Sequence, residues 1–299
     1  MRMESSVLVY DVGGSHVSAA VCSLDSYKLG PVISAPHPID ITSDAFVNLL
    51  HSVGGQAMSG FNQILGASMA FPGPFDYSAG ISQMTHKIPF LFGVNLRQAL
   101  AERFEWNPVQ LFFLNDATAY LLGELGSGSA RGMNRAIVIT LGTGIGSAFS
   151  VDGQVIMEGR GVPPRGEIWN LPYEDGIIED VLSTSAIQKA YALRTGQKRK
   201  IIDIAAAVEN DPTAAQVFRE FGYHLGRSLR QTLTLFSPDV VVFGGGISRA
   251  ADLFLPAAEY ELRDLNLSLR VSALQDRAPL VGAGLAWPKR TSILQKRGR

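Results

Sequence analysis

The chain has 299 residues with a formal net charge of −1, and 46% of its residues are hydrophobic against 18% that are charged. This length is enough for two domains of ordinary size, and the composition is typical of a globular protein and excludes an intrinsically disordered one. The balanced charge excludes the broad basic surface that nucleic acids or anionic membranes attract, so neither is expected as a partner. The single cysteine, Cys22, excludes an internal disulfide and indicates a cytoplasmic protein, and no apolar run is long enough to predict a transmembrane helix.

The first part of the chain predicts strands and helices in alternation. An apolar run at Val7–Tyr10, the pair Gly13 and Gly14, and a second apolar alternation at Val17–Val21 predict a β-hairpin. The apolar spacing then predicts strands at 64–71 and 111–114 and helices at 45–53 and 96–104.

The pattern of strand, glycine turn and strand begins again after residue 115. A helix is predicted at 117–125 and strands at 136–141 and 146–151, and Asp152 with Gly153 is typical of a two-residue hairpin turn. This restart predicts two similarly built domains with a boundary near residue 115.

A long amphipathic helix is predicted over Thr213–Phe236, where apolar residues recur at steps of three and four. The apolar run Asp239–Phe243 that follows is typical of a parallel strand buried on both faces, and a further helix is expected from about Arg249. Alternation of strands and helices indicates an α/β protein.

Three predicted strands run directly into glycines. The segments are YDVGGSH at Tyr10–His16, TLGTGIGS at Thr140–Ser147 and VVFGGGIS at Val241–Ser248. Glycine lets successive backbone N–H groups approach an anion without obstruction by a Cβ atom, which suits phosphate. Any one of these loops alone is better explained as a hairpin turn without a ligand. Three in one chain, with the hydroxyls of Ser15 and Thr143 interleaved, favour phosphate binding.

The loop sequences depart from two common phosphate motifs. None contains the Lys-Ser/Thr pair of a Walker A loop. GTGIGS resembles a dinucleotide-binding fingerprint, but a strand and not a helix follows it, which disfavours a dinucleotide fold. The candidate nucleotide-binding residues are therefore Asp11, Gly13, Gly14, Ser15, Gly142, Thr143, Gly144, Gly244, Gly245 and Gly246.

Two aspartates follow predicted strands close to these loops. Asp11 ends a buried strand beside the first glycine pair, where a carboxylate is costly unless it meets a cation or hydrogen-bond donors. A Mg²⁺ ion shared with nucleotide phosphates would meet this need, and so would the N–H groups of the turn itself. Asp116, after Asn115, is explained either as the N-cap of the next helix or as a general base that accepts a proton from an alcohol during phosphoryl transfer.

In this order, the motifs resemble the ROK family (repressors, open reading frames, kinases) of the actin-like ATPase superfamily. The resemblance extends from about Val7 to Trp287. It is carried by DVGGSHVSAAV, FPGPFDYSAGI, LNDATAYLLGE, ITLGTGIGSAFSVDGQVIMEG, FSPDVVVFGGGIS and APLVGAGLAW. It implies two RNase-H-like α/β domains with ATP and a sugar in a central cleft. The last motif resembles a closing helix that returns to the first domain, so the expected domains are 1–115 with 285–299, and 116–284.

The resemblance also implies roles for particular residues. Asp116 would be the catalytic base toward the 6-hydroxyl of a hexose, and Asn115 would hydrogen-bond ring hydroxyls. Glu167 and Glu179 would bind the far side of the sugar, since a polyhydroxyl ligand requires carboxylates and amides. The implied cofactors are ATP and Mg²⁺, and family analogy alone leads us to expect a homodimer.

Two positions depart from the family pattern. Asn170, in GEIWN at Gly166–Asn170, stands where a sugar-binding, zinc-linked histidine is usual, and no cysteine follows it. Zinc is therefore not expected, while Asn170 can still hydrogen-bond a sugar. His16 replaces a lysine that is frequent in the family, which weakens one possible phosphate contact.

Several functions agree with these motifs. The first is an ATP-dependent kinase for glucose, another hexose or an N-acetylhexosamine. A second is a glucokinase that uses polyphosphate as the donor. A third is a sugar-binding or regulatory protein without catalysis. A regulator that binds DNA directly is disfavoured, because only about ten residues precede Asp11 where family repressors carry a helix-turn-helix domain.

Overall fold

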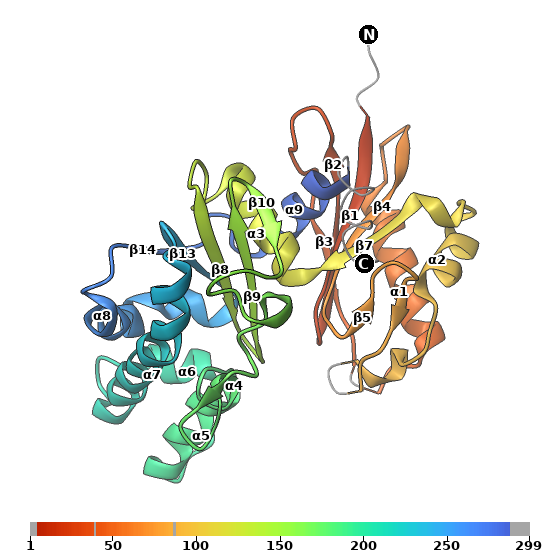
Figure 1. Ribbon diagram of the computed structural model, residues 1–299. Coiled ribbons are helices and arrows are strands. Elements are labelled where there is room, and N and C mark those ends of the chain that lie inside the picture. Colours follow the sequence, from red (N-terminus) through yellow and green to blue (C-terminus); the bar gives the residue numbers. More distant parts are fainter. Residues whose placement is uncertain (1–4, 39, 86–87, 288–299) are drawn as a thin grey trace. The chain divides into compact units, whose positions relative to one another are not determined.

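The computed structural model describes residues 5–38, 40–85 and 88–287, and these form two compact units (Figure 1). The first unit takes the described residues up to Gly126 and from Asp276 onward, and the second comprises Ser127–Gln275. The sequence predicts boundaries after residues 115 and 284. The observed boundaries differ, because the helix that follows residue 115 and the last described helix both belong to the first unit.

The first unit is built on a sheet of five strands in the order β3-β2-β1-β4-β7. Strands β1, β2 and β3 pair antiparallel, and β1, β4 and β7 pair parallel. Their bounds are β1 Ser6–Val12, β2 His16–Ser23, β3 Ile33–Pro36, β4 Ile64–Phe71 and β7 Leu111–Asn115. The predicted hairpin and the strand at 64–71 are confirmed, whereas β3 has no clear apolar alternation and was not predicted.

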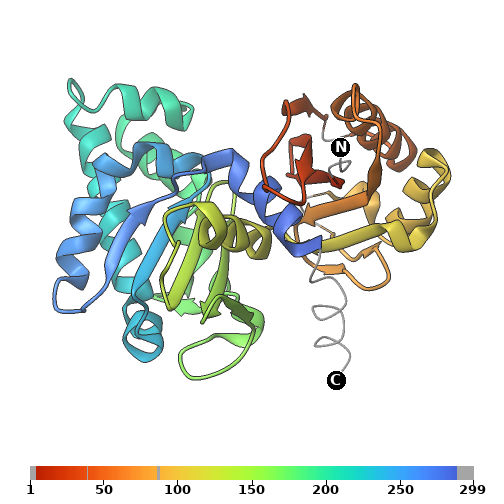
Figure 2. The same ribbon diagram turned by 90° about the horizontal axis from the view of Figure 1, so that it is seen from above.

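Helices cover both faces of this sheet. The helices α1 (Ser43–Ala57) and α2 (Leu96–Phe104) lie on the face of Tyr10, whose hydroxyl donates to the Leu50 carbonyl at 2.8 Å. The helix α9 (Ala278–Ala286) lies on the opposite face, where the Ser68 hydroxyl donates to the Ala283 carbonyl at 2.7 Å. Figure 2 shows the orange α1 and the blue α9 on opposite sides of the strands of this unit.

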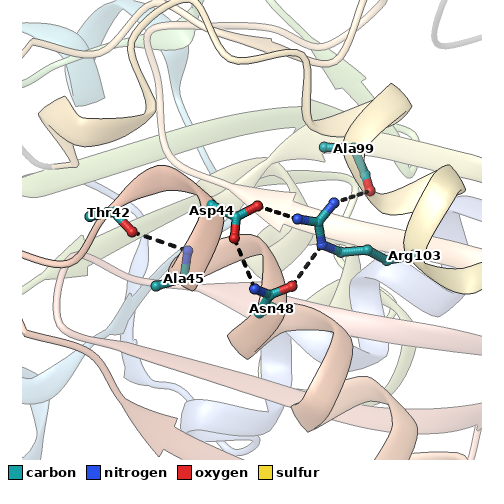
Figure 3. A network of polar contacts seen from close by, with 6 residues as sticks. All are labelled: Thr42, Asp44, Ala45, Asn48, Ala99 and Arg103. Carbon is teal, nitrogen blue, oxygen red and sulfur yellow. Dashed lines mark hydrogen bonds and ion pairs between the residues drawn. The ribbon is translucent and has the colours of Figure 1, made fainter.

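A polar network joins α1 to α2 on their exposed surface (Figure 3). The Arg103 guanidinium pairs with Asp44, and its Nε donates to Asn48 Oδ1 at 2.7 Å. Asn48 Nδ2 in turn donates to Asp44 Oδ2 at 3.1 Å, while the Thr42 hydroxyl caps α1 through Ala45 N. Exposed ion pairs stabilise weakly, so this network contributes little to the free energy of unfolding.

The backbones of α9 and α3 (Asp116–Ser127) cross in close contact within the first unit. A Cβ atom on Gly282 would overlap the Ala119 carbonyl oxygen, and one on Gly123 would overlap the Ala278 carbonyl oxygen. On the sheet side, Cys22 lies against Gly284. This crossing binds α3 and α9 to the first sheet, which explains why the unit extends beyond the predicted boundaries.

The second unit repeats the sheet order of the first, as β10-β9-β8-β13-β14. Strands β8, β9 and β10 pair antiparallel, and β8, β13 and β14 pair parallel. The bounds are β8 Arg135–Leu141, β9 Ile145–Val151, β10 Gln154–Ile156, β13 Val240–Gly244 and β14 Ser268–Val271. The turn between β9 and β10 has φ 52° at Asp152 and φ 70° at Gly153, which confirms the predicted two-residue hairpin.

The second unit lies entirely within the described residues and contains five α-helices besides this sheet. They are α4 Ile178–Val181, α5 Thr184–Thr195, α6 Ile201–Ala206, α7 Pro212–Phe236 and α8 Ala251–Leu262. The predicted apolar face of α7 is buried against the sheet and α8, and Asp211 caps its N-terminus by accepting from Thr213 N at 2.9 Å. The helix expected from about Arg249 begins at Ala251, because a 3-10 turn over Gly246–Ala250 precedes it.

Two further two-stranded sheets are too short to produce a period in the sequence. They are β5 (Phe75–Asp76) with β6 (Ile81–Ser82), and β11 (Pro172–Tyr173) with β12 (Gly176–Ile177). Among the helices that the structure describes, none combines the length and the apolar character needed to cross a membrane.

Replacing Gly282 by alanine should destabilise the first unit. The added methyl group has no room beside the Ala119 carbonyl, so α9 must move away from α3 and from the sheet. We expect Gly282→Ala to lower the free energy of unfolding by at least about 2 kcal/mol, measured by chemical denaturation against the wild type.

Gly55→Ala is the matched control. Gly55 is exposed in α1, and a Cβ atom there meets nothing within 4 Å. Alanine favours helix more than glycine does, so this variant should gain about 0.5–1 kcal/mol. Equal stabilities for the two variants would contradict the close crossing of α3 and α9.

Candidate active site

The first glycine loop joins β1 to β2 and is closed by a hydrogen bond from Gly13 N to the His16 carbonyl at 2.9 Å. The buried His37 contacts the backbone of this loop. His37 Nε2 lies 3.1 Å from the Gly13 carbonyl, and His37 N donates to the Ser15 carbonyl at 3.0 Å. The His37 ring packs edge-on against Phe46, with ring centroids 5.0 Å apart. No motif surrounds His37 in the sequence, so its support of the loop could not be predicted.

The carboxylate of Asp11 ends β1 beside this loop. Burial, together with the smaller effect of the negative charges of Asp116 and Asp276, raises the pKa of the Asp11 carboxyl from its ordinary 3.8 to about 7. Asp276 lies in the 3-10 turn Gln275–Arg277 before α9, far from Asp11 in the chain. It was not predicted, because only the return of the chain to the first unit brings it to Asp11.

The carboxylate of Asp116 accepts hydrogen bonds through one of its two oxygens. Its Oδ1 accepts from Ala117 N at 2.8 Å and from Asn115 Nδ2 at 3.0 Å. Asn115 Oδ1 accepts from Thr118 N at 3.0 Å, so Asn115 and not Asp116 occupies the N-cap role of α3. Among the described residues both of the bonds to Asp116 fall on Oδ1, which leaves its Oδ2 for another partner.

A tyrosine fixes the orientation of Asn115. Asn115 Nδ2 also donates to the Tyr77 hydroxyl at 3.2 Å, and that hydroxyl donates to the Phe71 carbonyl at the end of β4 at 3.0 Å. Tyr77 belongs to the FPGPFDYSAGI motif, whose family resemblance predicts no role for this residue. The chain of hydrogen bonds from Phe71 to Asp116 therefore fixes the carboxylate relative to the sheet.

The second glycine loop, between β8 and β9, is fastened at both ends. Gly142 N donates to the Gly144 carbonyl at 3.0 Å, and the Gly142 carbonyl accepts from Thr184 N at 2.8 Å and from its hydroxyl at 3.0 Å. At the other end Ile145 N donates to Glu179 Oε2 at 2.9 Å. Glu179 thus contacts the glycine loop, whereas the resemblance implied a sugar contact only.

The third glycine loop follows β13. Gly245 has φ 81°, and a Cβ atom there would overlap the Leu141 carbonyl oxygen at the start of the second loop. Because β13 pairs parallel with β8, with Gly244 opposite Thr140, both loops leave the same edge of the second sheet. The adjacency of these two loops therefore follows from the strand register.

The other predicted sugar-binding residues lie in one loop of the second unit. Glu167 Oε2 accepts from Arg165 at 3.0 Å and from Trp169 Nε1 at 3.2 Å, and Asn170 is exposed next to them. The Glu179 backbone N–H donates to the Trp169 carbonyl at 3.0 Å. The structure thus brings Glu167, Asn170 and Glu179 into one connected segment.

The predicted residues fall into two sets, one in each unit. The first unit holds the first loop, Asp11, Asn115 and Asp116, and the second unit holds the other two loops with the remaining carboxylates. Among the described residues no cluster of three or more His, Cys, Asp or Glu side chains has the arrangement of a metal-binding site. The chemistry of Asp11 alone suits Mg²⁺, because a carboxylate supplies the oxygen donors that this ion prefers.

Comparison with known proteins gives consistent matches. The model of the ROK family matches residues 7–290. Glucokinase from Thermotoga maritima is 30% identical over 215 residues, which are 63% of this chain and 66% of that protein. Polyphosphate glucokinase from Mycobacterium leprae is 27% identical over 281 residues, which are 92% of this chain and 72% of that protein.

A solved structure shares the fold. The ROK hexokinase from Thermus thermophilus superposes with a TM-score of 0.78 and 23% identity, covering 96% of this chain and 99% of that chain. The predicted α/β fold of actin-like ATPase type is thereby confirmed, and the repeated sheet order of the two units agrees with it.

The raised pKa of Asp11 predicts a pH-dependent stability. A carboxyl that binds its proton more tightly in the folded state than in the unfolded state costs stability as the pH rises from 3.8 to about 7. The free energy of unfolding of Asp11→Asn, minus that of the wild type, should therefore rise by roughly 2–4 kcal/mol across this pH range. Any effect of the substitution that does not depend on pH adds the same amount at every pH. Unfolding free energies measured without ligand from pH 4 to 8 test this.

Asp25→Asn is the control, because it also removes one negative charge but does so at an exposed position in the loop after β2. A stability difference between wild type and Asp11→Asn that does not change with pH would show that the folded protein does not favour the protonated carboxyl.

Proposed function

Because this chain belongs to the ROK family, we propose that it is a sugar kinase that transfers a phosphoryl group from ATP to the 6-hydroxyl of a hexose. The observation that carries the proposal is the placement of Asp116. Its Oδ1 is fixed by Asn115 and Ala117, and within the part of the chain that the structure describes its Oδ2 accepts no bond. Asp11 and the first glycine loop lie at the same edge of the sheet.

In the proposed reaction Asp116 Oδ2 accepts the proton of the sugar hydroxyl as that oxygen bonds to the terminal phosphorus of the donor, and the bond to the leaving diphosphate breaks. The fixed Oδ1 keeps the carboxylate from rotating, so the proton acceptor is already in place when the sugar binds. Asn115 then serves first to orient Asp116, because both of its amide hydrogens and its oxygen are engaged.

The glycine loops would hold the donor. Backbone N–H groups of Gly13–Ser15 and Gly142–Gly144, with the Ser15 and Thr143 hydroxyls, suit the phosphates, and Gly244–Gly246 suits the nucleoside end by family analogy. Mg²⁺, when bound, would neutralise phosphate charge and relieve the repulsion among the aspartates, and Asp11 is the residue we expect to hold it. His16 leaves the first loop without the cation that lysine would supply.

The acceptor is proposed to be glucose or an N-acetylhexosamine, bound by Glu167, Asn170 and Glu179. Relatives named glucokinase support the first choice. Polyphosphate is the alternative donor, and the match to a polyphosphate glucokinase over 92% of this chain favours including it in any test. A homodimer and a cytoplasmic location stay predictions.

A matrix of donors and sugars in the presence of Mg²⁺ tests the proposal. ATP and polyphosphate should be combined with glucose, mannose, fructose and the N-acetylated hexosamines, with the site of phosphorylation read by NMR. Turnover of at least one pair at the 6-position is expected. Sugar binding without turnover of any pair would instead support a regulator or a non-catalytic binder.

Asp116→Asn should lower kcat about 10²- to 10⁴-fold, because an amide keeps the shape and the accepted hydrogen bonds but takes no proton. The dissociation constant for the sugar, from calorimetry, should stay within about threefold. Asp252→Asn, which removes an exposed carboxylate from the first turn of α8, is the matched control and should retain full activity. A kcat loss of less than about tenfold in Asp116→Asn would remove Asp116 from the base role.

A further inference from the structure

The segment 166–184 of the second unit, here called the bridging segment, is anchored to the core at two points. At its start the Ser147 hydroxyl of β9 donates to the Gly166 carbonyl at 2.6 Å and accepts from Ile168 N at 3.1 Å. At the β11–β12 hairpin the Tyr173 hydroxyl lies 2.9 Å from His224 Nδ1 on α7. These anchors fix the segment to a strand and to the longest helix of the unit.

The two arms of the bridging segment are also tied to each other. Glu179 N donates to the Trp169 carbonyl and Ile178 N to the Leu171 carbonyl, both at 3.0 Å. Ile168 and Ile178 are each 1% exposed and join the core of the second unit. The arm with Glu167 and Asn170 therefore cannot shift without the arm that carries Glu179.

The bridging segment reaches both ends of the second glycine loop. Glu179 Oε2 accepts from Ile145 N at 2.9 Å, and Thr184 donates its N–H and its hydroxyl to the Gly142 carbonyl at 2.8 and 3.0 Å. Ile145 is 3% exposed, so its N–H group would be left buried without a partner if the carboxylate moved away. The geometry of the loop thus depends on this carboxylate.

From these contacts we infer that Glu179 is a positioning residue that couples the sugar to the phosphate loop. One oxygen, Oε2, holds the N–H group at the end of the loop, and the other, Oε1, accepts no hydrogen bond from the residues that the structure describes, so a sugar hydroxyl can take it. The second role rests on the proposed kinase function, whereas the first rests on contacts within the second unit alone. Sugar binding then orders the carboxylate and with it the loop, so the affinities for sugar and nucleotide are linked, and the linkage is reciprocal.

The first role is testable without any ligand. Amide hydrogen exchange over residues 141–147, followed by mass spectrometry, should be at least about fivefold faster in Glu179→Ala than in the wild type, because Ile145 N loses its acceptor. Glu179→Gln should exchange at the wild-type rate, since its amide oxygen can still accept from Ile145 N. Asp180→Asn, which removes the adjacent carboxylate from the same turn of α4, is the control and should also match the wild type.

Unchanged exchange in Glu179→Ala would overturn the positioning role. Accelerated exchange throughout the second unit, in place of the loop alone, would also overturn it, since general unfolding would then explain the effect. Thr184→Val supplies a second variant that removes one of the two bonds to the Gly142 carbonyl and leaves Glu179 intact. It should speed exchange at the start of the loop.

The coupling role is tested by calorimetry of the non-hydrolysable ATP analogue AMP-PNP with Mg²⁺, with and without saturating glucose or another sugar that the activity matrix identifies. In the wild type we expect the sugar to tighten nucleotide binding about fivefold or more, and in Glu179→Ala we expect this factor to approach one. Glu179→Gln should bind the nucleotide alone as the wild type does and bind the sugar about tenfold more weakly.

The outcomes separate the two proposals. Sugar tightening that persists undiminished in Glu179→Ala would overturn the coupling while leaving the kinase function standing. Failure of the wild type to bind any sugar would instead refute the proposed function, and the exchange experiment would still decide whether Glu179 holds the loop.

Discussion

In both units, the parallel pairing of three strands decides where the polar residues meet. Asp11 of β1 pairs with Ala70 of β4, and Phe71 of β4 pairs with Asn115 of β7, so the ends of all three strands lie at one edge of the first sheet. The same arrangement aligns Gly244 with Thr140 in the second sheet. A shift of one residue in either register of the first sheet would turn Asp11 or Asn115 to the opposite face.

Gathering carboxylates at such an edge has an energetic cost that hydrogen bonds offset only for some of them. Asp116 receives two donors on one oxygen, and Asn115 is itself fixed by Tyr77. Asp11, by contrast, lies at the end of β1 near the charges of Asp116 and Asp276, and its raised pKa shows that the folded chain alone does not stabilise its ionised form. A bound cation would supply the positive charge that this edge lacks, in agreement with the Mg²⁺ role proposed for Asp11.

Local sequence predicted most of the elements but few of the contacts that complete the site. The apolar residues at 64–71 and 96–104 predict a strand and a helix, and the observed bounds of both elements are the same as the predicted ones. The glycine loops and Asp116 stand out because glycine and acidic residues directly after apolar strands are unusual. His37, Tyr77 and Asp276 carry no such signal, since each acts through a partner distant in the chain, and Glu179 makes a backbone contact that only the folded segment reveals. The relation between Asp116 and a substrate, and the roles of Glu167 and Asn170, stay predictions.

The contact of Cys22 with α9 has a practical consequence for following motions of the first unit. This thiol is fully buried against Gly284, and burial raises its pKa to about 12, so both access and ionisation protect it from alkylation. It is also the only cysteine of the chain. Labelling of the native protein by a thiol reagent therefore requires a motion that uncovers this face of the sheet, and displacement of α9 is one such motion.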